Sequence, residues 1–300
     1  MPDPSVERPF GALLTAMVTP MTDDGEVDLD AAACLAVHLL DHGSDGLVVN
    51  GTTGESATTS DREQADLVRV VVDAVGGRGS VLAGAGSNDT RHAVALARQA
   101  AAAGAHGVLA VTPYYSRPGQ DGVVAHLTAI ADAGDLPVML YDVPARTGVR
   151  LAPDSLRRLA EHPRITAVKD ATGDSAAAIP LIPETGLAWY GGDDLLLLPF
   201  LAVGAVGLVS MAGHLVGEQL TQVIDLAETG EPARAREVFR SVLPAIDLIC
   251  GSGNGALRSK LSLSLLGLIP SAAMRLPQVP ADDVETEQVR VALTAALGRR

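Results

Sequence analysis

The stretch that decides the fold is Ile165-Thr166-Ala167-Val168-Lys169-Asp170-Ala171-Thr172-Gly173, in which a short apolar run ends at a lysine and a turn follows. Continuous hydrophobicity without alternation is typical of a strand buried on both faces, as in a parallel sheet. A lysine at the end of such a strand commonly extends its ammonium group into water. Apolar surroundings instead favour the neutral amine, which attacks ketones to form a Schiff base. Lys169 is therefore a candidate nucleophile. Whether it extends into water or acts as a neutral amine depends on the residues at the ends of the neighbouring strands.

The same pattern of apolar run, turn and amphipathic stretch recurs along the chain. The apolar runs that predict strands are residues 12–18, 46–49, 81–83, 107–111, 138–141, 165–168, 187–190 and 206–209. The stretches 28–42, 60–75 and 89–103 each begin with a capping residue and carry apolar positions at helical spacing. Eight strands with intervening helices over about 200 residues predict a (β/α)₈ TIM barrel, with an open doubly wound sheet as the main alternative.

The pattern changes after Ser210. Four further segments, 217–228, 232–249, 255–266 and 284–297, predict helices with no strand between them. We expect residues 1–228 to form the barrel behind a short N-terminal tail, and residues 229–300 to form a helical extension packed on it. No stretch is long and polar enough to be a linker between separate domains.

Composition narrows the functional classes. The net charge is −14, from 22 basic and 36 acidic residues, which disfavours binding to nucleic acid or to anionic membranes. An anionic substrate would therefore need a local cationic pocket. Two cysteines provide no disulfide framework and no zinc spacing. Neither a signal segment nor an apolar run of membrane-spanning length is found, so we expect a cytoplasmic protein.

The segments that follow the strands are rich in reactive groups. In (β/α)₈ barrels the chemistry lies in the loops after the carboxyl ends of the strands. Those loops contain GTTGES (51–56), GAGSN (84–88), TPYY (112–115), YDVPARTG (141–148), KDATG (169–173) and GGDD (191–194). One rim would thus hold an amine, phenols, hydroxyls and an arginine.

Each of these groups has a chemical use at a Schiff-base site. Tyr141, on the strand beside that of Lys169, can move protons if a relay of hydroxyls such as Thr52 and Tyr115 supports it. Backbone N–H groups of residues 51–54, with the Thr53 hydroxyl, can hold a carboxylate, and the planar fork of Arg146 suits a second one. Taken singly, the same residues could be a plain turn, core aromatics or a surface arginine. The occurrence of several such loops on one rim makes coincidence improbable.

These motifs, in this order and spacing, resemble the dihydrodipicolinate synthase / N-acetylneuraminate lyase family of pyruvate-binding class I aldolases. The resemblance rests on GTTGES, TPYY, LYDVPARTG (140–148), VKDATGD (168–174) and GGDD. It implies a covalent Schiff base of pyruvate on Lys169, with no separate cofactor and no metal. The site residues that it implies are Lys169, Tyr141, Thr52 and Tyr115 for catalysis, with Tyr115 reaching in from a neighbouring subunit, and Thr53, the backbone of Val209, Gly192 and Arg146 for substrate binding.

The resemblance implies condensation of pyruvate with L-aspartate 4-semialdehyde to 4-hydroxy-tetrahydrodipicolinate, in lysine and diaminopimelate biosynthesis, by a homotetramer built as a dimer of dimers. Threonine at the first of the two Thr positions in GTTGE and the arginine in PARTG favour the synthase over the lyase. A related aldolase acting on a 2-keto-3-deoxy sugar acid or a sialic acid is the main alternative. A catalytically silent binding paralogue is another.

Two further chemistries find less support. A metal-dependent class II aldolase needs clustered ligands, and His38 and His42, four residues apart on a predicted helix, indicate a helix-surface pair away from the rim. Dinucleotide binding needs a third glycine that Gly84-Ala85-Gly86 lacks.

Two segments depart from the family pattern. The lysine-inhibited relatives use two histidines and a glutamate in an allosteric pocket, and the matching positions here are Asp61, Gln64 and His92, although Ser56, Asn88 and Tyr114 remain. We therefore expect weak or absent inhibition by lysine. The segment Gly251-Ser252-Gly253-Asn254-Gly255 replaces a proline-containing one, and its role stays open.

Overall fold

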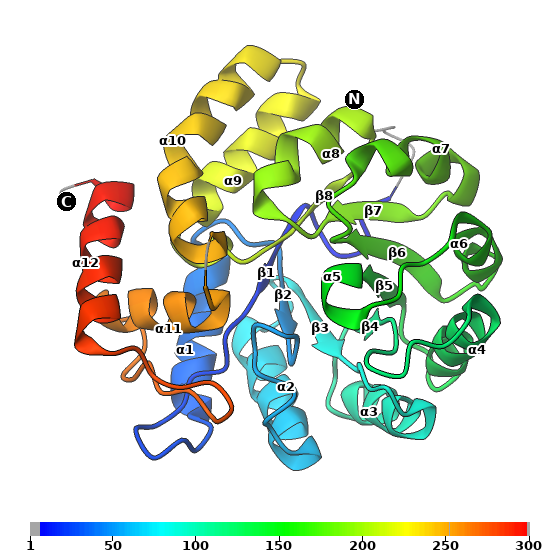
Figure 1. The fold of residues 1–300 in the computed structure, drawn as a ribbon, viewed down its shortest axis with the longest axis horizontal. Coiled ribbons are helices and arrows are strands. Elements are labelled where there is room, and N and C mark those ends of the chain that lie inside the picture. The colour runs from blue at the N-terminus through cyan, green and yellow to red at the C-terminus, as the bar shows by residue number, and fades with distance from the viewer. Residues whose placement is uncertain (1–6, 252, 299–300) are drawn as a thin grey trace.

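The computed structural model describes residues 7–251 and 253–298, so the expected N-terminal tail at residues 1–6, together with Ser252 and residues 299–300, lies outside the described part. Eight parallel strands close into a barrel in sequence order (Figure 1). The strands are β1 (Leu13–Ala16), β2 (Gly46–Val49), β3 (Ser80–Gly84), β4 (Gly107–Val111), β5 (Val138–Asp142), β6 (Ile165–Asp170), β7 (Ala188–Gly191) and β8 (Gly207–Ser210). Every predicted apolar run forms a strand, and the predicted (β/α)₈ TIM barrel is confirmed.

Helices surround the barrel and continue beyond it. They are α1 (Leu29–Asp41), α2 (Asp61–Val75), α3 (Thr90–Ala102), α4 (Gln120–Ala131), α5 (Pro144–Thr147), α6 (Pro153–Ala160), α7 (Ser175–Thr185), the 3₁₀ helix η1 (Asp194–Leu196), α8 (Leu197–Val203), α9 (Gly213–Glu228), α10 (Pro232–Cys250), α11 (Gly255–Leu265) and α12 (Asp283–Leu297). Capping residues begin them where the sequence predicts, as at Asp28, Ser60 and Asp89. None of these helices, all within the described residues, combines the length and the apolar character that crossing a bilayer requires.

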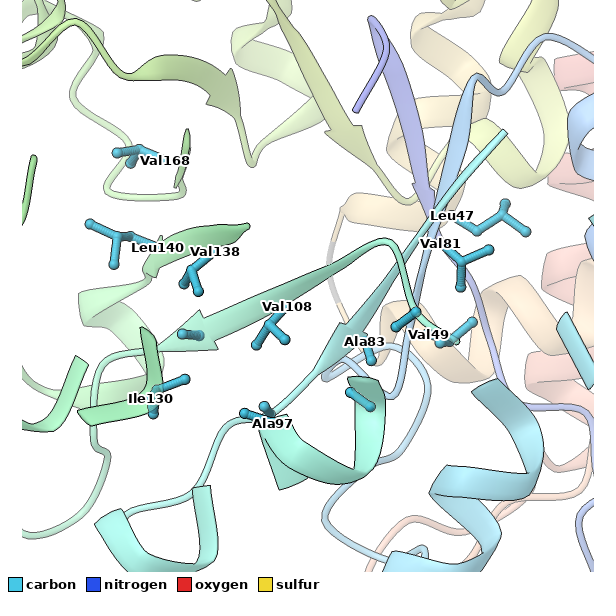
Figure 2. Packing of buried hydrophobic residues seen from close by; sticks show 14 of the residues in the cluster. Leu47, Val49, Val81, Ala83, Ala97, Val108, Ile130, Val138, Leu140 and Val168 are labelled. Atoms are coloured by element: carbon cyan, nitrogen blue, oxygen red, sulfur yellow. The ribbon is translucent and has the colours of Figure 1, made fainter. Parts of the chain in front are cut away.

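The strands are apolar on both faces because they separate two hydrophobic layers. Figure 2 shows side chains of β2 to β6, such as Leu47, Val81 and Leu140, gathered with Ala97 of α3 and Ile130 of α4 between barrel and helices. The residues that alternate with them, such as Val48 and Leu82, fill the barrel interior. Successive side chains of a strand point to opposite faces, so sequence position decides which layer each one enters.

Besides shifts of one or two residues at several element ends, three differences from the sequence prediction bear on the site. Strand β6 continues through Lys169 to Asp170, because its pairing with β5 extends to Tyr141↔Lys169 and Asp142↔Asp170. Helix α9 begins at Gly213 rather than at residue 217, since one turn precedes a kink at Val216 (φ −136°, ψ 33°). The segment after β5, expected as a loop, contains the short helix α5, which Pro144 opens and Gly148 closes in the left-handed conformation.

The predicted extension packs on the barrel through shared apolar clusters. Phe239, Val242 and Ile246 of α10 join Leu220 and Ile224 of α9 and Leu13 of β1 in one cluster. Further along, α10, α11 and α12 meet in a smaller cluster of their own. Figure 1 places α10 to α12 together at one side of the barrel.

Candidate active site

Lys169 and Tyr141 meet inside the mouth of the barrel. They are direct partners on adjacent strands, so both side chains point to the same face, and Tyr141 belongs to the interior cluster. Lys169 Nζ lies 4.3 Å from the centroid of the Tyr141 ring. Both residues are buried, with 7% of Lys169 and 8% of Tyr141 exposed. The lysine does not extend into bulk water, and the interpretation of a snorkelling surface lysine is wrong.

The loop after β2 folds into a series of tight turns that present two hydroxyls. Gly54 N donates to Gly51 O at 3.1 Å, and Glu55 N donates to Thr52 O at 3.1 Å. The Thr19 hydroxyl holds this loop on the barrel by donating to Gly54 O at 2.6 Å. Thr52 is exposed at the rim, whereas Thr53 is buried.

Two aromatic residues follow β4, and they are placed differently from Tyr141. Tyr115 is 90% exposed and has a positive φ of 67°, and Tyr114 is 38% exposed. A positive φ is uncommon for a non-glycine residue. The turn therefore directs a large aromatic side chain outward rather than into its own core.

Arg146 lies in α5, after β5. Its side chain is exposed, and among residues 7–251 and 253–298 it forms no ion pair. An arginine at this rim supplies the local positive charge that a strongly acidic chain needs in order to hold an anionic substrate.

A single cavity of about 1120 Å³ brings most of these loops together. Its lining includes Thr52, Thr53, Tyr115, Tyr141 and Arg146. Lys169, Val209 and Gly192 are not among the lining residues, and Lys169 lies against Tyr141, which is. The cavity also extends over Gly253 and Gly255, so the unassigned glycine-rich segment forms part of its wall.

The remaining two predicted residues lie deeper. Val209 of β8 is 1% exposed and belongs to the same interior cluster as Tyr141. Gly192 N donates to Asp170 O at 2.7 Å, and a Cβ on Gly192 would come within 2.9 Å of the Ala171 side chain. Glycine at residue 192 therefore lets the turn after β7 close onto the end of β6.

Sequence reasoning missed the carboxylates that support the site from outside the barrel. Asp170 Oδ2 accepts a hydrogen bond from Trp189 Nε1 at 3.1 Å, and Asp142 Oδ2 accepts from Leu151 N at 3.2 Å. Burial, with repulsion from Asp170, raises the pKa of Asp142 to about 7, although the Leu151 amide and Arg150 oppose the shift. An acidic residue directly after a buried strand residue was the available signal in both cases.

Another missed carboxylate holds the turn after β8. Asp194, the last residue of GGDD, is fully buried and accepts hydrogen bonds from Met211 N at 3.1 Å and Ala212 N at 3.2 Å. Burial raises the pKa of this carboxyl, and hydrogen bonds from Ser210 and from the backbone oppose the shift. The hydrogen bonds to the buried Asp194 carboxyl thus hold the turn that follows Val209.

The positions that differ from the lysine-inhibited relatives lie on the wall of the same cavity. Asp61, Gln64 and His92 line it together with Ser56 and Tyr114, whereas Asn88 does not. His92 Nε2 lies 3.0 Å from Asp61 Oδ1, and Gln64 Nε2 donates to Ser56 O at 3.0 Å. These side chains pair with one another and with the backbone.

The helix-surface histidine pair lies apart from this site. His38 lies in the last turn of α1 and His42 follows as its C-cap, with ring centroids 4.0 Å apart, and neither residue lines the cavity. Across the described residues, no group of three or more His, Cys, Asp and Glu is arranged to hold a metal ion.

Comparison with known proteins identifies the family. The model of the dihydrodipicolinate synthetase family matches residues 9–296. The chain belongs to this family. It is 53% identical over 294 residues to 4-hydroxy-tetrahydrodipicolinate synthase 2 of Streptomyces coelicolor, covering 98% of each chain.

Solved structures of the family match the whole barrel and its extension. The dihydrodipicolinate synthase of Cyanidioschyzon merolae with lysine bound has a TM-score of 0.92 and 39% identity, covering 97% of this chain and 99% of that one. The chloride-inhibited enzyme of Acinetobacter baumannii complexed with pyruvate has a TM-score of 0.90 and 34% identity, covering 95% and 98%. The family resemblance predicted from the motifs is confirmed.

Proposed function

We infer that the chain is a lyase that condenses pyruvate with L-aspartate 4-semialdehyde to give 4-hydroxy-tetrahydrodipicolinate, a step of lysine and diaminopimelate biosynthesis. The observation that carries the inference is the buried Lys169 amine, 4.3 Å from the centroid of the Tyr141 ring. The 53% identity to a synthase of the same reaction over nearly the full length favours this substrate pair over a sugar acid.

The proposed chemistry begins at Lys169. Its neutral amine attacks the keto carbon of pyruvate, and the carbinolamine loses water to give a Schiff base. Removal of a proton from the methyl carbon gives an enamine, which attacks the aldehyde carbon of the semialdehyde. Intramolecular attack by the substrate amine then closes the ring and releases Lys169. No metal or separate cofactor enters this scheme.

Tyr141 is the proton donor and acceptor in these steps, with Thr52 and Tyr115 as its relay. Thr53, the backbone at Val209 and Gly192 bind pyruvate. Arg146 holds the carboxylate of the aldehyde substrate. The exposed position of Arg146 on the cavity wall supports this role, since a guanidinium pairs with a carboxylate in a bidentate manner.

We propose a cytoplasmic homotetramer, a dimer of dimers, in which Tyr115 completes the site of a neighbouring subunit. The support is that Tyr115 is 90% exposed, so its aromatic ring lacks a core of its own to pack in.

Inhibition by lysine is expected to be weak or absent. The enzyme of Cyanidioschyzon merolae was solved with lysine bound, but here Asp61 and His92 form a pair, 3.0 Å apart, on the wall of the cavity. Activity measured at millimolar lysine checks this expectation, and inhibition by more than half would contradict it.

Borohydride trapping tests the proposed function. The chain is incubated with pyruvate and reduced, and we expect a mass adduct on Lys169 that Lys169→Ala lacks. Tyr141→Phe should keep the adduct but lose at least about 100-fold in turnover, since proton transfer contributes 10²–10⁴-fold. Aspartate semialdehyde is assayed beside sugar aldehydes. An adduct with turnover of sugar aldehydes alone would favour the related aldolase, and the absence of any adduct would favour a silent paralogue.

A further inference from the structure

A buried ion pair joins the C-terminal extension to the loop that carries Thr52 and Thr53. Lys260 of α11 is 0% exposed, and its ammonium group donates to Glu55 Oε1 and, at 2.7 Å, to Ala273 O. Glu55 is 7% exposed. Taking two charges out of water is costly, and a buried ion pair often adds little to stability.

The second oxygen of Glu55 is held by the same extension. Arg275 N donates to Glu55 Oε2 at 3.2 Å. The Arg275 side chain donates to Thr58 O at 2.9 Å and to Gly25 O at 2.7 Å, and it forms an ion pair with Glu63. Both carboxylate oxygens of Glu55, and the chain that follows it, are thus bound by residues 260–275.

Glu55 in turn is bonded to the proposed relay. Its N–H donates to Thr52 O at 3.1 Å, and its φ is +56°, a conformation that a non-glycine residue rarely adopts without support. A shift of Glu55 therefore moves Thr52 and Thr53 with it. A displacement of about 1 Å in a catalytic group can lower a rate by about 100-fold.

We propose that Lys260 and Glu55 are positioning residues, which set the place of Thr52 and Thr53 from the C-terminal extension. The proposal rests on the proposed function of that loop in pyruvate binding and proton transfer. It assigns the extension a part in catalysis, beyond its contribution of apolar surface.

The experiment compares Lys260→Met, Glu55→Gln and the double variant in the full chain. Each single variant leaves one buried charge without its partner, so both should unfold at a lower temperature than the wild type. The double variant has neither charge, and its melting temperature should return towards that of the wild type. Glu55→Gln keeps the size of the side chain and an oxygen acceptor, so it serves if Lys260→Met does not fold.

The kinetic constants separate positioning from stability. We expect KM for pyruvate to rise and kcat to fall, each by about 10-fold, in all three variants including the double one. The KM for the semialdehyde should change less than 3-fold, because Arg146 lies in α5, apart from the loop after β2. A double variant that recovers both its melting temperature and wild-type kinetic constants would overturn the proposal.

Two controls keep the outcomes apart. Arg290→Met removes an exposed ion pair with Glu287 on α12, and it should leave all constants unchanged. Wild-type protein, trapped with pyruvate and assayed in parallel, tests the function itself. If the wild type does not react with pyruvate, the proposed function fails. If it reacts and the variants match it, only the positioning role fails.

Discussion

Adjacent residues at the ends of β5 and β6 face opposite environments, and the contrast sets their chemistry. Tyr141 and Lys169 point into the barrel, whereas Asp142 and Asp170 are direct partners on the next pair of positions and face the helix layer. Two carboxyl groups thus lie behind the proposed catalytic pair, and the buried Asp142 Oδ1 has no hydrogen-bond partner among the described residues.

We predict that Asp142→Asn stabilises the protein above neutral pH. Burial raises the pKa of Asp142 from 3.8 to about 7, so the folded state binds this proton more tightly than the unfolded state does. Stability from this group therefore falls as the pH rises from about 4 to 7, by at most about 4 kcal/mol, and stays constant above. Asparagine has no such proton to lose.

Urea unfolding of the variant and the wild type from pH 4 to 8 checks this prediction. The difference in unfolding free energy should grow up to about pH 7 and then level off. The same substitution at the exposed Asp23 is the control. A flat difference for Asp142→Asn would contradict the prediction.

A site residue could be predicted from the sequence only where a local motif marks it. Lys169, Tyr141 and Arg146 could be found because each stands in a motif next to a recognisable strand. Lys260 could not, because it lies in a helix whose other residues are mostly apolar or small, and its partner Glu55 is 205 positions away. A charge buried by tertiary pairing leaves no periodic trace in the sequence.

At the scale of elements, a glycine allows β3 and the loop after β2 to approach closely. A Cβ on Gly84 would come within 2.1 Å of Asn50 O, a backbone atom that cannot rotate away. Asn50 directly precedes the loop of Thr52 and Thr53. The backbone there must shift if any side chain is added.

We predict that Gly84→Ala lowers the free energy of unfolding by about 1–3 kcal/mol, the usual cost of overpacking, and lowers kcat/KM for pyruvate as well. Gly134→Ala is the matched control, because its Cβ would meet only the Ala101 side chain at 3.8 Å. Denaturant unfolding and steady-state kinetics measure the two effects. Wild-type values for Gly84→Ala would show that the strand and the loop can separate at no cost.

The elements were predictable as far as their local patterns extended. Eight apolar runs and the capping residues Asp28, Ser60 and Asp89 place most strands and helices within a few residues. The end of β6 was missed because ladder pairing with β5, rather than hydrophobicity, carries it through Lys169. The kink at Val216 was missed because nothing in the local sequence marks a break in that helix.

At the scale of the whole molecule, the exposed Tyr115 leads to a prediction about mixed assemblies. If Tyr115 acts on a neighbouring site, a Lys169→Ala chain still supplies Tyr115 to the site of a Tyr115→Phe partner, which keeps its own Lys169. Random pairing of equal amounts should then restore about a quarter of the wild-type sites, since half the dimers are mixed and each has one intact site.

Co-expression of the two variants, followed by assay and sedimentation, measures this complementation. Each variant alone should be nearly inactive, and a mixture without subunit exchange is the control. No gain in activity after exchange, or a fully active monomer in sedimentation, would contradict a shared site.

The single tryptophan of the chain lies on β7, next to β6, the strand that carries Lys169. Trp189 is 2% exposed and donates its indole N–H to Asp170, the residue after Lys169. Indole fluorescence depends on polarity and hydrogen bonding around the ring, so light emitted after selective excitation of indole comes from one known place. The molecule therefore contains its own optical probe, with which events at the neighbouring amine can be followed in real time without any dye.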